Sequence, residues 1–218
     1  MTTLETTGPS AETIRRALAG FGLEVDDKQV SQIQRFIRIL THWNEKLNLT
    51  AIRDPVEILH RHFCESMFAA AAVPMEFGRL ADIGTGAGFP GIALKIFRPD
   101  LELFLVESNI KKGTFLAEVV RELELTNSRV LISRYEELGE ELAPLEYVCA
   151  RALGDHRTCL KWAASAQLSA GRLVLWIGGR DLDEIQESAE WAWRQPIVVP
   201  QSLRRYILVG TKKVATSA

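Results

Sequence analysis

The segment from Leu80 to Gly91, LADIGTGAGFPG, constrains the fold of this chain more than any other stretch. It begins as a short apolar run, passes three glycines at alternate positions and reaches Pro90, a residue that suits the first turn of a helix. Glycine lacks a Cβ, so such a turn can adopt positive φ and let a ligand lie against bare backbone. A helix N-terminus adds free N–H groups and positive potential, which favour an anionic group. The segment therefore predicts a strand, a turn that binds a nucleotide-like ligand, and a helix.

The remainder of the chain after residue 79 alternates short apolar runs with helical patterns. We expect strands at 79–83, 101–106, 129–132, 146–150, 172–177, 196–199 and 205–210, and helices at 90–97, 109–124, 136–142, 156–168 and 182–193. This alternation predicts right-handed crossovers and a mostly parallel seven-stranded sheet with helices on both faces. Only a few residues join the last two strands, so they should pair antiparallel.

Three helices are predicted upstream. Ser10 can cap the first, and the second begins near Asp26 or Asp27 and carries apolar residues at three- and four-residue steps as far as about Asn48. The pair Asp54-Pro55 begins the third, which should run to about Ala72. We therefore expect a helical N-terminal region over 1–75 and an α/β domain over 76–218, packed as one compact unit.

Composition excludes several classes of protein. No apolar run approaches the roughly 18 residues that cross a bilayer, and no basic-then-apolar leader begins the chain, so we expect a cytoplasmic protein without membrane contact. The three cysteines lack CxxC spacing, which favours buried thiols over a disulfide framework or zinc knuckle. His60 and His62 lie two residues apart, on different faces of a helix, so no metal site is expected.

Charges are segregated along the sequence although the formal net charge is only -2. Residues 151–180 hold five basic residues and one acid, residues 181–190 hold five acids and no base, and residues 194–218 hold five basic residues and no acid. Basic segments can present a face to a polyanion. An ordinary exposed surface with a mosaic of positive and negative side chains fits the same pattern. Both interpretations, a polyanion-binding face and an ordinary surface, stay open at this point.

The glycine turn fits more than one cofactor. Residues 86–91 match GxGxxG, so a NAD-binding oxidoreductase must be considered. Asp82, two residues before the first glycine, completes an Asp-x-Gly-x-Gly-x-Gly run that is typical of S-adenosylmethionine (AdoMet) methyltransferases. Glu107, at the end of the second expected strand, is placed to accept hydrogen bonds from ribose hydroxyls in either class. A tight turn without a ligand is the third interpretation.

Motifs across the chain resemble those of one particular protein family. The segments Asp82–Gly91, Val106-Glu-Ser, Ser133-Arg-Tyr-Glu-Glu and Ala150-Arg-Ala resemble the bacterial small-subunit ribosomal RNA methyltransferase G family, formerly called glucose-inhibited division protein B. The likeness extends from about residue 30 to residue 213. It implies a Rossmann-like AdoMet-dependent methyltransferase fold and methylation of guanine N7 in 16S rRNA. The implied partner is 16S rRNA or the small ribosomal subunit, and we expect a monomer.

The resemblance also implies which residues form the site. Gly84, Phe89, Tyr135, Glu136 and Arg151 fall on the cofactor-binding positions of the family. Asp82, Gly86, Gly88 and Glu107 join the candidate cofactor site because they lie in the Asp-x-Gly-x-Gly-x-Gly run or at the end of the second expected strand. Arg151, after the fourth expected strand, is the candidate catalytic residue, because it could lie between cofactor and base and bond guanine O6 or the AdoMet carboxylate.

The candidate phosphate contacts are basic, and the chain departs from the family pattern at two places. The expected RNA-binding residues are Lys111, Lys112, Arg180, Arg204 and Arg205. The family usually has a lysine-glycine pair after the fifth strand, where this chain reads Gly178-Gly179-Arg180, so Arg180 is expected to supply the charge. Glu65 also stands where the family tends to have aspartate. A methyltransferase with another acceptor, and a non-enzymatic RNA-binding module, remain alternatives.

Overall fold

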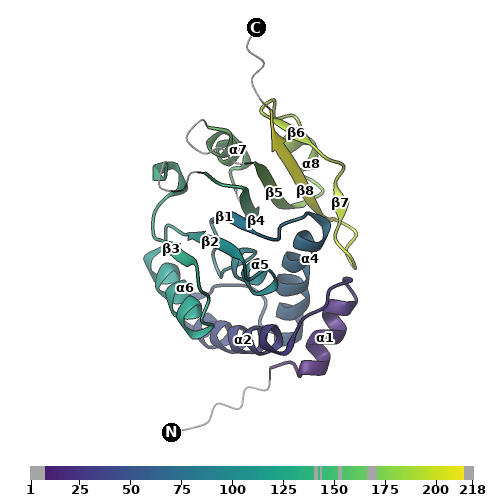
Figure 1. The fold of residues 1–218 in the computed structure, drawn as a ribbon, viewed down its shortest axis with the longest axis vertical. Helices are drawn as coiled ribbons and strands as arrows, with labels where there is room; N and C mark the ends of the chain where they lie inside the picture. The colour runs from purple at the N-terminus through teal and green to yellow at the C-terminus, as the bar shows by residue number, and fades with distance from the viewer. Residues whose placement is uncertain (1–7, 140–141, 143, 152–153, 166–170, 214–218) are drawn as a thin grey trace.

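A computed structural model describes residues 8–139, 142, 144–151, 154–165 and 171–213, and its centre is one eight-stranded sheet (Figure 1). The spatial order of the strands is β3-β2-β1-β4-β5-β8-β6, and β7 pairs with β8. The bounds are β1 Gly78–Ile83, β2 Leu101–Val106, β3 Ser128–Leu131, β4 Tyr147–Arg151, β5 Arg172–Gly178, β6 Trp191–Trp193, β7 Ile197–Val198 and β8 Arg205–Lys212.

The connectivity confirms the predicted Rossmann-like sheet. Strands β1 to β5 pair in parallel, and β8 runs antiparallel to β5, β6 and β7. After β1 the chain moves outward through β2 and β3, then returns to place β4 on the other side of β1. The strand order therefore reverses between β1 and β4, and a ligand crevice is expected beyond the carboxyl ends of these two strands.

One strand replaces part of a predicted helix. The helix expected over 182–193 ends early, as α8 Leu182–Gln186, and β6 follows. Trp191 is 1% exposed, and its indole N–H donates to the Leu160 carbonyl at 3.2 Å. Aromatic residues pack well on a half-buried sheet, so burial of Trp191 outweighs the helical pattern of this segment. The sheet consequently has eight strands rather than seven.

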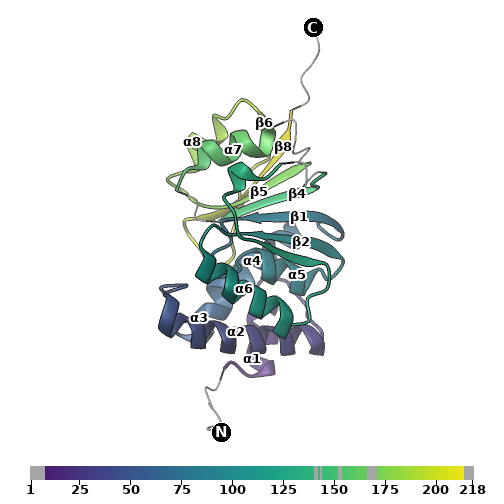
Figure 2. The same ribbon diagram turned by 90° about the vertical axis from the view of Figure 1, so that its left-hand side faces the viewer.

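Helices cover both faces of the sheet (Figure 2). On one side lie α4 Glu65–Ala72, α5 Gly91–Phe97 and α6 Ile110–Glu122, with the other N-terminal helices beyond them, and on the other lie α7 His156–Ala164 and α8. Each face has its own cluster of buried apolar side chains. This arrangement follows from right-handed crossovers on either side of the strand reversal.

The N-terminal helices begin at the caps that the sequence predicts. Ser10 caps α1 Ala11–Ala19, and Asp26 forms a capping box with Gln29 at the start of α2 Asp27–Leu47. The third helix is confirmed from Pro55 to Ala72, but it is not uniform. It consists of α3 Pro55–Ile58, the π-helical stretch η1 Leu59–Cys64 and α4 Glu65–Ala72. Such π stretches occur often at functional sites.

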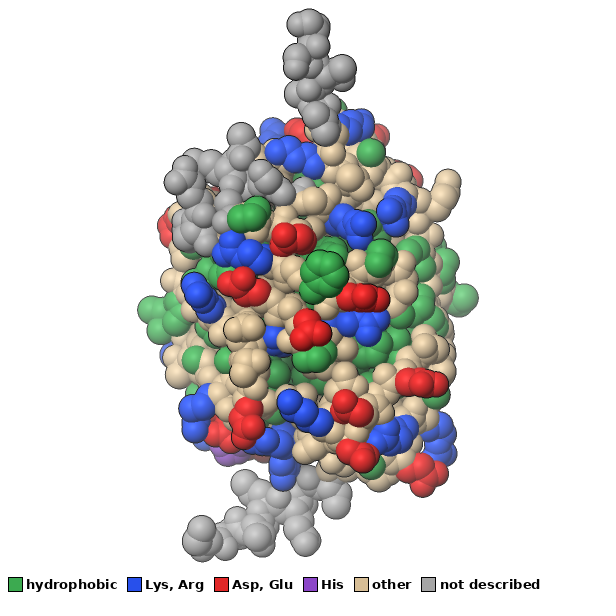
Figure 3. Space-filling view, in the orientation of Figure 1, with side chains coloured by type: hydrophobic (Ala, Val, Ile, Leu, Met, Phe, Trp, Pro, Cys, Tyr) green, Lys and Arg blue, Asp and Glu red, His purple; other side chains and the backbone are tan. Residues whose placement is uncertain are grey.

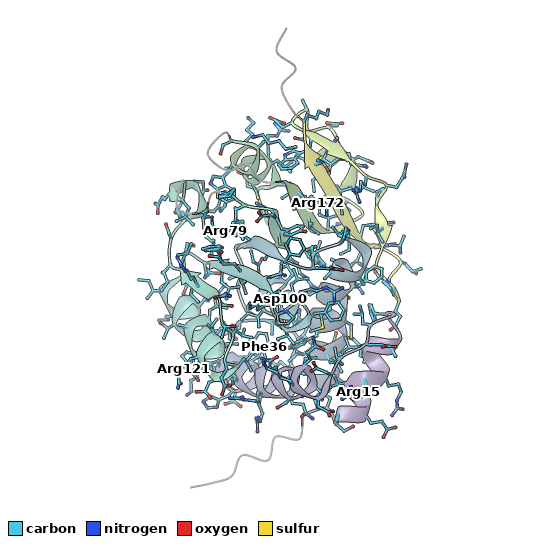
Figure 4. All side chains as sticks on the ribbon, viewed as in Figure 1. Arg15, Phe36, Arg79, Asp100, Arg121 and Arg172 are labelled. Atoms are coloured by element: carbon cyan, nitrogen blue, oxygen red, sulfur yellow. The ribbon has the colours of Figure 1, made fainter. Side chains whose placement is uncertain are left out.

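An aromatic cluster joins the N-terminal helices to the sheet domain. Phe36 of α2 lies between that helix and the strands (Figure 4) and is fully buried. Its ring stacks on Phe89 with centroids 5.0 Å apart and meets Phe63 edge-on at 5.3 Å. Residues before 76 therefore share one core with the glycine turn.

Two other helices differ from expectation. The helix predicted over 136–142 is a 3-10 turn, η2 Tyr135–Glu137, followed by extended Leu138, because Gly139 weakens a helix here by about 1 kcal/mol relative to alanine. The helix predicted over 156–168 ends at Ala164, since Ser165 is extended. Residues 140, 141 and 166–168 lie outside the described residues. Across the described helices, none has the length and apolar character to cross a membrane.

Candidate functional site

Asp82 holds the glycine turn after β1 from the buried side of the turn. Gly84, Gly86 and Gly88 have φ values of 64°, 57° and 89°, a region that favours glycine. The Asp82 carboxylate is fully buried, and its Oδ2 accepts hydrogen bonds from Thr85 Oγ1 at 2.6 Å and Gly91 N at 2.7 Å. Asp82 thus fixes the shape of the turn from inside the protein.

Burial makes the Asp82 carboxyl electrostatically unusual. Desolvation raises its pKa to about 7, and the hydrogen bonds from Thr85 and Gly91 only partly oppose this. Its Oδ1 is buried and has no hydrogen-bond partner among the described residues. Because the pKa of this carboxyl lies near 7, a positive charge placed above the turn would favour its ionised form.

A groove of about 230 Å³ gathers four of the predicted cofactor residues. It is lined by Gly84, Val106, Glu107, Ser108, Ser133, Arg134, Tyr135 and Glu136, at the carboxyl ends of β1, β2 and β3. Glu107 Oε2 accepts from Gly86 N at 3.1 Å and Oε1 accepts from Asn109 N at 2.8 Å. The groove is open to ribose-sized and purine-sized groups and carries a carboxylate at its floor.

Phe89 occupies a different environment from these residues. It is 7% exposed and lies between the rings of Phe36 and His62, the latter stacked with centroids 4.8 Å apart. His62 also bonds Thr50 through Nε2 and Oγ1 at 2.9 Å. Burial lowers the pKa of His62 to about 3, with further contributions from Arg151 and Arg61, so the imidazole is neutral. The Phe89 side chain therefore supports the turn as part of a stack.

The second feature of this edge is a cluster of three arginines around Glu65. The Glu65 side chain is 3% exposed; its Oε2 lies 3.3 Å from Arg151 Nη2, and its Oε1 lies 2.8 Å from Arg205 Nη2 and 3.1 Å from Arg61 Nε. Arg151 Nη2 also donates to the Arg61 carbonyl at 2.8 Å. The N-terminal region, β4 and β8 thus meet at one carboxylate, which balances one of the three positive charges.

Arg151 and Arg205 face a cavity of about 650 Å³. Its lining comes from α4, β4, β5, α7, α8, β8 and the segments that connect them: Glu65, Arg151, Gly154, Asp155, His156, Arg157, Trp176, Ile177, Gly178, Asp181, Glu184, Val199, Arg205 and Tyr206. The groove at Gly84 lies on the β2 side of the strand reversal and this cavity on the β5 side. Arg151, at the end of β4, stands next to β1 and its glycine turn.

The predicted RNA-binding residues are spread along the same edge. Lys111 and Lys112 lie in the first turn of α6, after β2. Arg180 and Arg204 are exposed and close to each other, since Gly179 N donates to the Arg204 carbonyl at 3.0 Å. Arg205 instead pairs with Glu65. On the face shown in Figure 3, basic and acidic side chains are interspersed, which is the mosaic that the sequence left open.

Sequence reasoning missed three residues of this region. Glu65 was noted only as a departure from the family pattern, His62 was considered only as a metal ligand and rejected, and Asp181 was not singled out. The i, i+4 spacing of Arg61 and Glu65 within an apolar stretch is a signal for a buried ion pair. Within the described part of the chain, no group of three or more His, Cys, Asp or Glu residues could hold a metal.

Comparison with known proteins agrees with this geometry. A family profile described as rRNA small subunit methyltransferase G matches residues 29–202. The ribosomal RNA small subunit methyltransferase G of Chloroflexus aggregans is 34% identical over 221 residues, covering 96% of this chain and 93% of the relative. That of Xanthomonas axonopodis pv. citri is 46% identical over 129 residues, 59% of each chain.

Solved structures share the fold at low sequence identity. A SAM-dependent methyltransferase from Aquifex aeolicus gives a TM-score of 0.59 at 16% identity, covering 76% of this chain and 97% of that one. A putative RNA methyltransferase from Pyrococcus horikoshii gives 0.57 at 15%, covering 84% and 100%. The profile and the full-length relatives together show that this chain belongs to the rRNA small subunit methyltransferase G family.

Proposed function

We propose that this protein transfers a methyl group from AdoMet to N7 of a guanine in 16S rRNA. The observation that carries the proposal is the division of one sheet edge into two compartments. A groove at Gly84, Glu107, Tyr135 and Glu136 suits the nucleoside part of a cofactor, and a larger cavity beyond Arg151 suits an acceptor nucleotide. Family membership supplies the substrate class.

The residues of the groove fit AdoMet. Each oxygen of Glu107 accepts one backbone hydrogen bond and retains a second lone pair, so the carboxylate can receive ribose hydroxyls while it holds the turn. Tyr135 and Glu136 lie on the opposite side of the groove, after β3, where an aromatic face and a carboxylate can contact adenine. When bound, AdoMet supplies a methyl carbon attached to positively charged sulfur.

The protein's contribution to such a transfer is mainly orientation. Guanine N7 carries a free lone pair at neutral pH and needs no general base. Correct placement of two reactants accounts for about 7–11 kcal/mol of a barrier. Arg151 stands between the two compartments and keeps a buried Nη1 without a hydrogen-bond partner among the described residues, so it can donate to guanine O6 or to the carboxylate of AdoMet.

The basic residues along the edge would hold the RNA. Lys111, Lys112, Arg180 and Arg204 can contact phosphates, and such contacts weaken as salt rises. We further propose that the protein acts as a monomer. With 16S rRNA or the small subunit as substrate, we propose that the reaction takes place in the cytoplasm.

The test is incubation with methyl-labelled AdoMet and 16S rRNA, small ribosomal subunits, or no RNA. We expect label in RNA only, and a loss of at least tenfold in rate for Arg151→Ala with AdoMet affinity measured in parallel. Transfer without RNA would indicate a small-molecule acceptor, and RNA binding without transfer a non-enzymatic module. Thermal stabilisation by NAD but not AdoMet would indicate the oxidoreductase.

A further inference from the structure

The 650 Å³ cavity carries both hydrogen-bond donors and a hydrogen-bond acceptor that the protein leaves unused. Its donors are arginine nitrogens: Arg151 Nη1 and Arg205 Nε are buried and have no hydrogen-bond partner among the described residues. Buried donors are normally paired in folded proteins. These two therefore call for an acceptor from a molecule that enters the cavity.

The acceptor is the carboxylate of Asp181. Four acidic residues line the cavity, and three have partners: Glu65 binds the arginines, Asp155 accepts from Thr158 N and Oγ1 at 3.0 and 2.6 Å, and Glu184 lies 3.8 Å from Arg157. Asp181 is half-buried and makes no side-chain hydrogen bond or ion pair with the described residues.

The local backbone fixes where this carboxylate lies. Asp181 N donates to the Gly178 carbonyl at 3.1 Å, so the chain turns back over the end of β5. The Asp181 Oδ2 lies 3.8 Å from the position that a Cβ on Gly178 would occupy. Gly178 is opposite Arg205 in the β5–β8 pairing, and all three residues line the cavity. The carboxylate thus stands at the strand end, in the cavity that Arg151 and Arg205 also line.

Guanine matches this combination of groups. Its O6 and N7 are acceptors along one edge, and its N1–H and N2–H₂ are adjacent donors that a carboxylate can receive together. Adenine presents a lone pair at N1 and no amino group at C2, so the carboxylate would repel it. We propose that Asp181 is the guanine-specificity residue of this cavity, receiving N1–H and N2–H₂ of the acceptor base while arginine donates to O6. This rests on the proposed function.

Asp181 would also favour the reaction itself. The N7 lone pair forms the bond to the methyl carbon while the carbon–sulfur bond pair returns to sulfur, so positive charge moves onto the base. A carboxylate at the N1–N2 edge stabilises that developing charge. Loss of Asp181 should therefore lower kcat as well as RNA affinity.

The experiment pairs a protein change with a base change. RNA fragments carrying either guanosine or inosine at the acceptor position are compared in wild type, Asp181→Asn and the control Asp183→Asn, which changes an exposed acid two residues away that does not line the cavity. For wild type and the control we expect inosine, which lacks N2–H₂, to lower kcat/KM about 10- to 100-fold. In Asp181→Asn the guanosine substrate should fall by a similar factor and the inosine penalty should shrink to about twofold or less.

Equilibrium binding of the same RNAs, by fluorescence anisotropy with S-adenosylhomocysteine present, gives a readout that does not need transfer. An equal inosine penalty in wild type and Asp181→Asn would overturn the proposal and leave Asp181 as a solvated acid at the start of α8. Unchanged AdoMet affinity and melting temperature show that each variant is folded. If wild type prefers guanosine in binding but transfers no methyl, the proposed function fails while the specificity assignment stands.

Discussion

Replacement of Glu65 by glutamine removes the charge that Arg61, Arg151 and Arg205 share, with little change in side-chain volume. Taking one partner from a buried ion pair costs about 3–5 kcal/mol because the other charge stays buried. Here Arg61 and Arg205 are 39% and 33% exposed and can turn toward water, whereas Arg151 is 17% exposed. We therefore expect the lower end, a loss of about 3 kcal/mol in the free energy of unfolding.

Urea-induced unfolding measures this loss, provided that the slope m stays unchanged. The matched control is Glu12→Gln, which breaks an i, i+4 pair with Arg16 whose side chains are 84% and 73% exposed, and should lose no more than about 0.5 kcal/mol. Adding Arg205→Met to Glu65→Gln removes one uncompensated charge and should recover about 1 kcal/mol. A Glu65→Gln protein within about 0.5 kcal/mol of wild type would show that the cluster is not a buried charge centre.

Three further predictions concern the turn, the stack and the RNA contacts. Gly88→Ala should lose about 2 kcal/mol of stability and most AdoMet affinity, because φ is +89° and the new Cβ would lie 2.5 Å from Ile92 Cδ1; unaltered melting and binding would contradict this. The pKa of His62 is 6.5 in the unfolded chain and is lowered to about 3 in the folded protein. Below about pH 6.5 the unfolded chain therefore binds a proton that the folded protein does not, and stability falls as the pH drops toward 3. Wild type should thus lose stability faster than His62→Phe between pH 7 and 4, and parallel pH curves would exclude a buried neutral imidazole. Arg180→Gln and Arg204→Gln should each lower the slope of log affinity for RNA against log salt by about 1 without changing AdoMet affinity; unchanged slopes would remove these residues from the interface.

Local sequence signals account for much of the fold. Glycines at alternate positions, helix caps at Ser10 and Asp54, and apolar runs of strand length each act over a few residues, and the structure contains the elements that they predict. The order of the strands, with its reversal between β1 and β4, was not predicted, because local signals do not report which strands pair.

The elements that were wrong depend on distant contacts. Residues 191–193 carry a helical pattern, but Trp191 gains more from packing on the far edge of the sheet against α7. The π-helical stretch at 59–64 likewise leaves no mark in the apolar periodicity. Such features are decided by tertiary packing, which overrides weak local preference.

The site likewise combines residues that local sequence signals indicate with residues that depend on distant contacts. Glu107 was found because it ends a predicted strand and Gly84 because it lies in the glycine turn, whereas Tyr135 and Glu136 were found only through the resemblance to the family. Glu65 was missed because its partners Arg151 and Arg205 lie far along the chain, on β4 and β8, and spacing in the sequence does not report that meeting. Asp181 was missed because its free carboxylate becomes notable only once its neighbours are seen to have partners.

The most direct test of the proposed reaction is the identity of the methylated nucleoside. Small ribosomal subunits incubated with the protein and AdoMet carrying a deuterated methyl group would be digested to nucleosides and separated by mass spectrometry. We predict labelled 7-methylguanosine with the wild-type protein and a strongly reduced yield with Arg151→Ala. Label in any other nucleoside, or full labelling by Arg151→Ala, would contradict it.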